Sequence, residues 1–175
     1  EIHSMSMEYL TYPWMEYFFK EKADQYRRTH LEEGLRVIPY MACVDEFQHE
    51  VYAQKMTDAK ERYKLWHSLE EKYMPWRDYD GDAFLEAGGF WMQKQHIFMC
   101  PFYYIDYSLA SMGAFEYYIR SLNDREEAWK DYYRLCTMGG SKGYLELLDE
   151  GNLSNPFSEG TVEGIMKKLR KRIFQ

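Results

Sequence analysis

Apolar residues recur at intervals of three and four along the sequence, and this spacing is the feature that most constrains the fold. Two series show it: Met41, Val44, Phe47 and Val51, and then Tyr63, Trp66, Leu69 and Tyr73. Residues spaced in this way lie on one face of an α-helix. No segment alternates cleanly between apolar and polar residues, as a half-buried strand does. The sequence therefore predicts an all-α fold.

Capping and turn residues indicate where the helices begin and end. Thr29, with Glu32 three positions later, has the pattern of a capping box and predicts a new helix there. Pro39 weakens the continuity of that helix. Pro101 stands near the first position of another, where proline is favoured. The main helices are expected over residues 1–12, 14–28, 40–52, 58–74, 102–119, 124–137 and 162–172.

The chain of 175 residues has a length typical of one domain. We therefore expect a single all-helical unit over residues 1–175. A helical pattern is already running at Glu1, with no capping residue before it. This start predicts that the chain is the C-terminal part of a larger protein whose N-terminal part is missing here.

Charge and cysteine content exclude several classes of function. The 22 basic and 29 acidic residues give a net charge of −7, which argues against nucleic-acid binding. The longest apolar run, 97–105, is interrupted by Pro101 and is too short to span a membrane. The three cysteines are widely spaced and form no metal or redox motif, as is typical of a reducing compartment. We expect a cytoplasmic protein that binds neither nucleic acid nor membrane.

A histidine followed by three tyrosines is the strongest candidate for a catalytic group. His96 precedes Tyr103, Tyr104 and Tyr107. On a helix that begins near Pro101, Tyr104 and Tyr107 share a face. Phenol hydroxyls fixed beside a histidine can stabilise a developing oxyanion. On spacing alone, a tyrosine-rich core helix next to a loop histidine explains the pattern better than a catalytic group does.

Two further patterns concern metal binding. Glu46 and His49 have the Glu-x-x-His spacing of di-iron helical bundles, but the chain contains no second copy of the motif. Glu1 could act as a metal ligand, although alone it is an ordinary surface glutamate. No His-Glu-x-x-His motif is present.

Several segments together resemble the oligoendopeptidase F and Pz-peptidase branch of the thimet oligopeptidase family. They are EIHSMSME at residues 1–8, FQH at 47–49, HIFMCPFYYIDY at 96–107, the turn GGSKGYLELL and the later Asn155-Pro156-Phe157. The resemblance runs through essentially the whole chain, and the tyrosine-rich segment is its most specific part.

The resemblance implies the C-terminal part of a zincin-like catalytic domain, in an endopeptidase that uses zinc to hydrolyse short peptides. Glu1 matches the glutamate that supplies the third zinc ligand. His96, Tyr104 and Tyr107 best match the residues that polarise the scissile carbonyl, and Tyr103 is a close alternative because the match there tolerates a shift of one residue. Tyr103 and His96 also match residues that contact the substrate. The His-Glu-x-x-His half of the site is absent here, so the chain alone is expected to be inactive.

Two other functions stay open at this point. One is a di-iron helical bundle built around Glu46 and His49. The other is a helical interaction domain without catalysis. Iron content distinguishes the di-iron bundle from a zinc peptidase. The absence of both bound metal and peptidase activity identifies the interaction domain.

Overall fold

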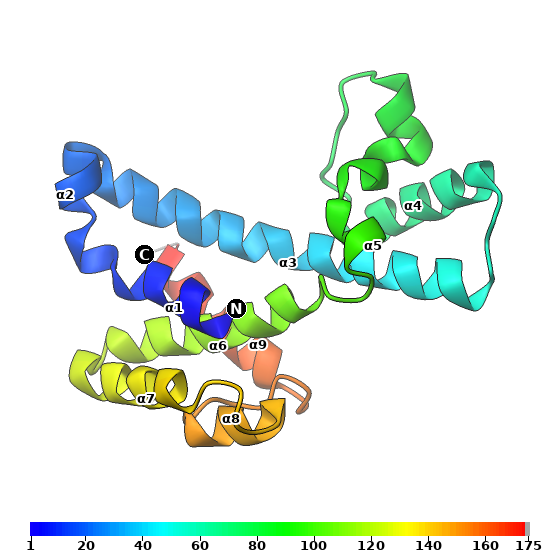
Figure 1. The fold of residues 1–175 in the computed structure, drawn as a ribbon. Coiled ribbons are helices and arrows are strands. Elements are labelled where there is room, and N and C mark those ends of the chain that lie inside the picture. The colour runs from blue at the N-terminus through cyan, green and yellow to red at the C-terminus, as the bar shows by residue number, and fades with distance from the viewer. Residues whose placement is uncertain (174–175) are drawn as a thin grey trace. The chain divides into compact units, whose positions relative to one another are not determined.

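The computed structural model describes residues 1–173, with side chains for residues 1–171. Within this range, helices joined by turns and loops are the only regular secondary structure. Figure 1 shows their order along the chain. The short 3₁₀ or π turns are η1 (Tyr12–Trp14), η2 (Lys20–Lys22), η3 (Leu85–Gly89) and η4 (Phe90–Gln93). The α-helices are α1 (Ile2–Leu10), α2 (Glu16–Phe19), α3 (Ala23–Ala53), α4 (Ala59–Tyr73), α5 (Gln95–Met99), α6 (Asp106–Ser121), α7 (Arg125–Met138), α8 (Tyr144–Glu150) and α9 (Thr161–Ile173).

The all-α prediction is confirmed, and the chain divides into two compact units. Unit 1 comprises Glu1–Leu35 and Leu109–Gln175, and unit 2 comprises Arg36–Ser108. Helices α3 and α6 each contribute residues to both units. The expectation that residues 1–175 behave as a single domain stays a prediction.

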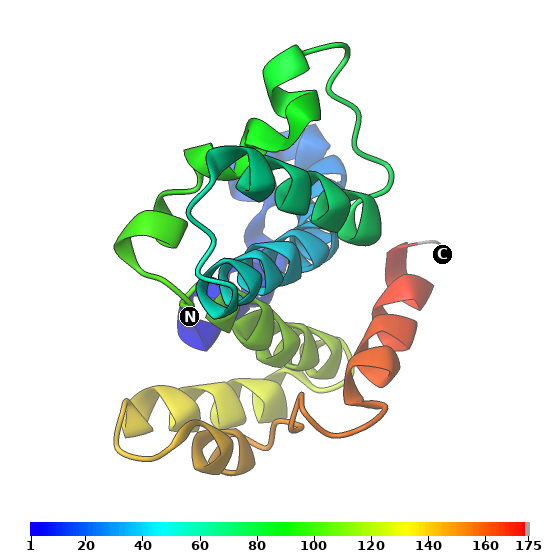
Figure 2. The same ribbon diagram turned by 90° about the vertical axis from the view of Figure 1, so that its right-hand side faces the viewer.

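Unit 1 is built around tyrosines whose hydroxyls are bonded. Tyr117 is fully buried between α6 and α7, and its hydroxyl donates to the backbone oxygen of Gly151 at 2.9 Å. Tyr132 packs edge-on against it and donates to the backbone oxygen of His3 at 3.0 Å. In Figure 2 the helices α7 and α8 lie side by side. The bonded hydroxyls explain how a tyrosine-rich core avoids burying unsatisfied donors.

Unit 2 packs the C-terminal part of α3 against α4 and the turns that follow. Phe47 of α3 and Trp66 of α4, both buried, meet edge to face with ring centroids 5.2 Å apart. The predicted 3,4-spaced series of both helices supply much of this core. Asp58 begins α4 by accepting hydrogen bonds from the backbone N–H groups of Lys60 and Glu61, as an N-cap residue does.

The predicted break before residue 40 is wrong. Helix α3 runs without interruption from Ala23 to Ala53, with Pro39 inside it. Proline removes one hydrogen bond from a helix interior. The buried residues Tyr40 and Met41 continue the helix beyond the proline. The free energy gained by burying this helix face therefore outweighs the missing hydrogen bond. Thr29 lies inside α3, so it does not begin a new helix as its capping-box pattern predicted.

Gly88 and Gly89 are buried and closely packed. Gly88 has φ +93° and is buried against α4. A Cβ atom at this position would lie 2.1 Å from the backbone oxygen of Tyr63. Only glycine combines this left-handed conformation with so close an approach of two backbones. Residue 88 therefore fixes η3 against α4.

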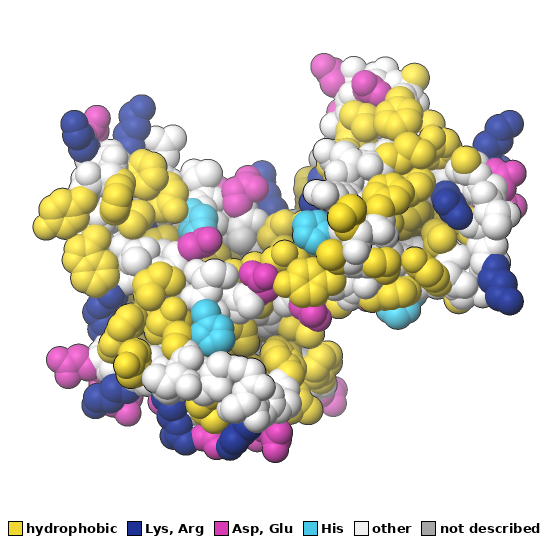
Figure 3. All heavy atoms as spheres, in the orientation of Figure 1, with side chains coloured by type: hydrophobic (Ala, Val, Ile, Leu, Met, Phe, Trp, Pro, Cys, Tyr) yellow, Lys and Arg dark blue, Asp and Glu magenta, His cyan; other side chains and the backbone are white. Residues whose placement is uncertain are grey.

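Aromatic side chains are exposed around α2 in unit 1. Tyr17 and Phe18 are 82% and 73% exposed, and hydrophobic side chains gather over α2 in Figure 3. Within residues 1–173, no helix is both long enough and apolar enough to cross a bilayer.

Candidate active site

His96 lies on the short helix α5 in unit 2, not in the irregular segment that the sequence suggested. Its half-buried imidazole is surrounded by three phenol rings. Ring centroids are 4.9 Å away for Tyr104, 5.7 Å for Tyr107 and 6.4 Å for Tyr103. The structure thus brings together all four candidate residues of the tyrosine-rich segment. We call this group the His–Tyr cluster.

The tyrosines reach His96 from a turn as well as from a helix. Helix α6 begins at Asp106, so the prediction of a helix from residue 102 is wrong. Tyr103 and Tyr104 lie in the preceding turn, and only Tyr107 lies in the first helical turn. The predicted common helical face therefore does not exist. The tyrosines converge because the chain turns between Cys100 and Asp106.

Tyr104 and Tyr107, the two tyrosines that the resemblance assigns to polarising the scissile carbonyl, have different hydrogen-bond partners. The hydroxyl of Tyr107 lies 3.5 Å from Nε2 of His96, a long and weak contact. The hydroxyl of Tyr104 accepts a hydrogen bond from Nζ of Lys94 at 3.0 Å. Tyr104 is also buried, whereas Tyr107 is half-buried. Tyr107 is therefore the more accessible of the two.

Lys94 is a member of the site that the sequence analysis missed. Its ammonium lies over the rings of Tyr104 and Tyr40, at 4.6 and 5.1 Å from their centroids. Cation–π contacts of this kind contribute about 0.5–2 kcal/mol each. The ammonium places a positive charge beside the His–Tyr cluster. No pattern in the sequence distinguishes this lysine from other surface lysines.

Within residues 1–171, one buried group of the cluster and one beside it have no hydrogen-bond partner. They are Nδ1 of His96 and the hydroxyl of Tyr40, which packs edge-on against Tyr104. Burial raises the pKa of the Tyr40 phenol above its ordinary value, so this group stays neutral. Burial likewise raises the pKa of the nearby Cys43 thiol to about 12, which makes it a poor nucleophile.

A buried glutamine holds the turn that carries Tyr103 and Tyr104. Gln48 is 1% exposed, and its Oε1 accepts a hydrogen bond from the backbone N–H of Phe102 at 2.9 Å. Its Nε2 donates to the backbone oxygen of Val44 at 3.2 Å. Phe102 has φ +64°, a conformation that costs a non-glycine residue free energy. The bond to Gln48 helps to stabilise this conformation.

Glu1 lies in unit 1, whereas the His–Tyr cluster lies in unit 2. It is the N-cap residue of α1 and is exposed, and Ser4 Oγ donates to its Oε2 at 3.4 Å. Among the described residues, no three His, Cys, Asp or Glu side chains group so as to hold a metal ion. An exposed carboxylate suits a metal site whose other ligands come from elsewhere. The metal-ligand role of Glu1 therefore stays a prediction.

The Glu46 and His49 pair has other partners. Glu46 accepts hydrogen bonds from Lys72 at 2.6 Å and from the hydroxyl of Tyr73. These contacts lower the pKa of the Glu46 carboxyl, with the Lys72 ammonium as the main cause. His49 is exposed and pairs with Asp45 at 3.4 Å. The di-iron arrangement therefore has no support in the contacts of these residues.

Comparison with solved structures identifies the class of protein: the fold is that of the helical part of peptidase structures. The chain is similar to structures of oligoendopeptidase F and Pz-peptidase. It matches an oligoendopeptidase F structure with a TM-score of 0.98 and 46% identity over 99% of this chain and 31% of that one. It matches Pz-peptidase A, solved with an inhibitor, with a TM-score of 0.97 and 47% identity, over 99% and 31%.

A third structure, an oligoendopeptidase F from Bacillus anthracis strain Ames, matches with a TM-score of 0.82 and 40% identity, over 99% of this chain and 28% of that one. The chain thus spans less than a third of the length of the structures it matches. No protein-family model and no curated protein matches it. These structures confirm the resemblance that the sequence indicates.

Proposed function

We propose that this chain forms part of a zinc-dependent endopeptidase that hydrolyses short peptides. The observation that carries the proposal is the packing of three tyrosines around His96, in a chain 47% identical to Pz-peptidase A over 99% of its length. Three thiols, none of them in a disulfide, are in keeping with the cytoplasm.

Zinc binding in this proposal is shared between this chain and the remainder of the enzyme. Glu1 supplies one carboxylate ligand. A His-Glu-x-x-His helix outside this chain supplies two histidine ligands and the general base. A bound zinc ion lowers the pKa of a coordinated water and polarises a carbonyl group. The chain alone is therefore expected to be inactive, and the part of the enzyme that carries this motif is its required partner.

The His–Tyr cluster acts on the substrate carbonyl. As the oxygen of water bonds to the carbonyl carbon, the carbonyl oxygen gains negative charge. The Tyr107 hydroxyl donates a hydrogen bond to that oxygen, with His96 beside it, and Tyr104 is the second candidate donor. The C–N bond then breaks, and the released amine takes up a proton that originated from the water. Tyr103 contacts the peptide.

Phenylalanine substitutions in the complete enzyme test these roles. Tyr107→Phe is expected to lower kcat by about 10²–10³-fold, because an oxyanion donor contributes only in the transition state. Tyr104→Phe measures the second donor, and Tyr133→Phe, at an exposed tyrosine of α7, is the control. Near-normal turnover of both the Tyr104 and Tyr107 variants on a fluorogenic short peptide would contradict the assignment.

Metal analysis tests the ligand assignment separately. Glu1→Gln is expected to reduce the zinc content of the complete enzyme well below one ion per chain, whereas Glu21→Gln at an exposed position is expected to retain it. Stoichiometric zinc in the Glu1 variant would rule Glu1 out. Tandem mass spectrometry of the uncleaved protein tests whether a His-Glu-x-x-His motif precedes Glu1.

A further inference from the structure

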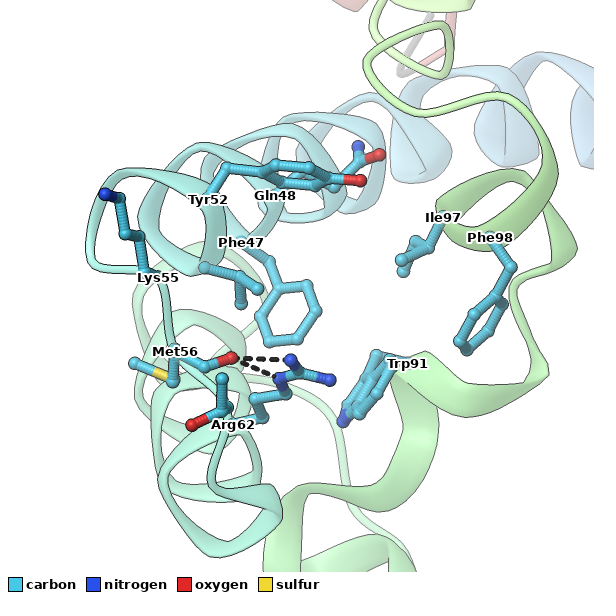
Figure 4. Close-up of a pocket in the computed structure, with 11 residues that line it drawn as sticks. Phe47, Gln48, Tyr52, Lys55, Met56, Arg62, Trp91, Ile97 and Phe98 are labelled. Atoms are coloured by element: carbon cyan, nitrogen blue, oxygen red, sulfur yellow. Dashed lines mark hydrogen bonds between the residues drawn. The ribbon is translucent and has the colours of Figure 1, made fainter.

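Unit 2 contains a cavity of about 490 Å³ that none of the His–Tyr cluster residues lines. Its walls come from the end of α3, the segment between α3 and α4, the first turn of α4, and the short helices η4 and α5, as Figure 4 shows. The volume lies within the range of about 300–1,000 Å³ that is typical of small-ligand pockets.

One wall of the cavity is aromatic and partly rigid. Trp91 is 4% exposed, and Phe47 is 1% exposed. Their ring centroids lie 5.1 Å apart, and Phe98 stacks on Trp91 at 5.6 Å. Phe98 is 59% exposed, so it forms an open lip beside a buried wall. Such a wall accepts one apolar side chain of moderate size.

A fixed guanidinium faces this wall. The Nε and Nη2 atoms of Arg62 both donate to the backbone oxygen of Met56, at 2.9 and 2.5 Å. This pair of bonds fixes the plane of the guanidinium, which Figure 4 shows directed across the cavity toward Trp91. Nη1 donates to none of residues 1–171, so within this chain the nitrogen is open to a ligand.

A buried donor also belongs to the cavity wall. The indole Nε1 of Trp91 is buried without a hydrogen-bond partner. A buried N–H group left unsatisfied costs about 1–3 kcal/mol. In Figure 4 the indole nitrogen lies at the end of the Trp91 ring farther from the Arg62 guanidinium. Trp91 is therefore a residue of the cavity wall whose N–H group no protein acceptor satisfies.

The charge of the cavity wall differs in sign from that of the chain. The chain carries a net charge of −7. The residues that line the cavity include the cations Lys55 and Arg62 and no acidic residue. No ion pair of either cation is recorded among residues 1–171. The wall therefore favours a ligand that is apolar at one end and anionic at the other.

We propose that this cavity binds the C-terminal residue of a peptide. Its apolar side chain packs against Phe47 and Trp91, and its free carboxylate pairs with Arg62. The peptide assignment rests on the proposed function, whereas the apolar and anionic character of the ligand rests on the cavity alone.

Binding of N-acetyl-phenylalanine and its amide to the complete protein, measured by calorimetry in the presence of a metal chelator, tests the proposal. We expect the acid to bind at least about tenfold more tightly than the amide, because only the acid pairs with Arg62. This assay requires neither zinc nor turnover. Its failure is thus distinguishable from failure of the peptidase proposal.

Two variants and one control locate the site. Arg62→Gln is expected to remove the preference for the acid, and Trp91→Phe to weaken its binding several-fold. Lys64→Gln, an exposed cation of α4 outside the cavity wall, is expected to change neither. Trp91→Phe keeps the test valid if Arg62→Gln unfolds. Equal binding of acid and amide, unchanged binding in both cavity variants, or tighter binding of decanoate would overturn the proposal.

Discussion

The side-chain oxygen of Gln48 accepts a hydrogen bond from the backbone N–H of Phe102, which lies 54 positions later in the sequence. The bond joins the C-terminal part of α3 to the turn that carries Tyr103 and Tyr104. Gln48 is fully buried, whereas Phe102 is 37% exposed, so the bond is part-buried. The geometry of the His–Tyr cluster thus depends on one amide group in α3.

Replacing Gln48 with methionine tests this dependence. The variant keeps an unbranched side chain of similar length but leaves the Phe102 N–H without its acceptor. We expect a loss of about 0.5–1.5 kcal/mol in the free energy of unfolding, since the variant lacks this part-buried hydrogen bond. Hydrogen exchange at residue 102 should become faster. Gln54→Met, at an exposed position just after α3, should change neither quantity.

Alanine at Gly88 is expected to be among the most destabilising substitutions in the chain. The added Cβ meets the backbone oxygen of Tyr63, and φ +93° is strained for alanine. We expect a loss of about 3 kcal/mol or more in urea denaturation, from strain and overpacking together. Gly164→Ala, inside α9 with open space around it, should instead stabilise the protein by up to about 1 kcal/mol. Equal effects of the two substitutions would contradict this account.

Alanine at Gly34 should reveal a second close approach. Its Cβ would lie 2.3 Å from the hydroxyl oxygen of Tyr9, a ring buried in unit 1. We expect a loss of about 1–3 kcal/mol despite the higher helix propensity of alanine. Adding Tyr9→Phe removes the clashing oxygen and should recover part of the loss. A double-mutant cycle that yields simple additivity would show that the two side chains do not interfere.

The Glu46 carboxyl should make stability depend on pH. Its pKa is lower in the folded protein than its ordinary value because of Lys72 and Tyr73. The folded state therefore binds this proton less readily, and the contacts stabilise the fold above the ordinary glutamate pKa of about 4.3. That stabilisation is lost as the pH falls through the lowered pKa. Glu46→Gln should lower the melting temperature at neutral pH.

Melting curves at several pH values check this prediction. The difference between wild type and Glu46→Gln should shrink as the pH falls below about 4. Glu33→Gln, at an exposed position of α3, should differ from wild type by little at any pH. A difference for Glu46→Gln that is constant with pH would show that the carboxylate charge does not stabilise the fold.

The sequence predicts some helix boundaries well because the signals are local. Asp124 accepts a hydrogen bond from the backbone N–H of Glu127 and begins α7 as predicted. The 3,4-spaced series around Phe47 and Trp66 likewise correspond to the core of unit 2. In both cases the decisive contacts join residues close together in the chain or on one helix face.

Predictions failed where a distant contact decides the local conformation. Pro101 has the sequence pattern of a helix start, but Gln48 binds the N–H of Phe102, and α6 begins only at Asp106. A signal for this contact exists in the sequence. Gln48 falls within the apolar series between Val44 and Val51, and a polar residue on a buried face needs a hydrogen-bond partner. Which partner it finds depends on the fold.

The dependence of the tyrosine turn on Gln48 also limits how far the turn can be transplanted. A designer who copies residues 95–107 onto another helical scaffold transfers the histidine and the three tyrosines but not the amide that holds Phe102. Without this hydrogen bond, the copied loop lacks the contact that stabilises the left-handed conformation of Phe102. The smallest segment set that can be transferred therefore includes the turn of α3 around Gln48. The His–Tyr cluster must be transferred together with it, as two helices and a loop.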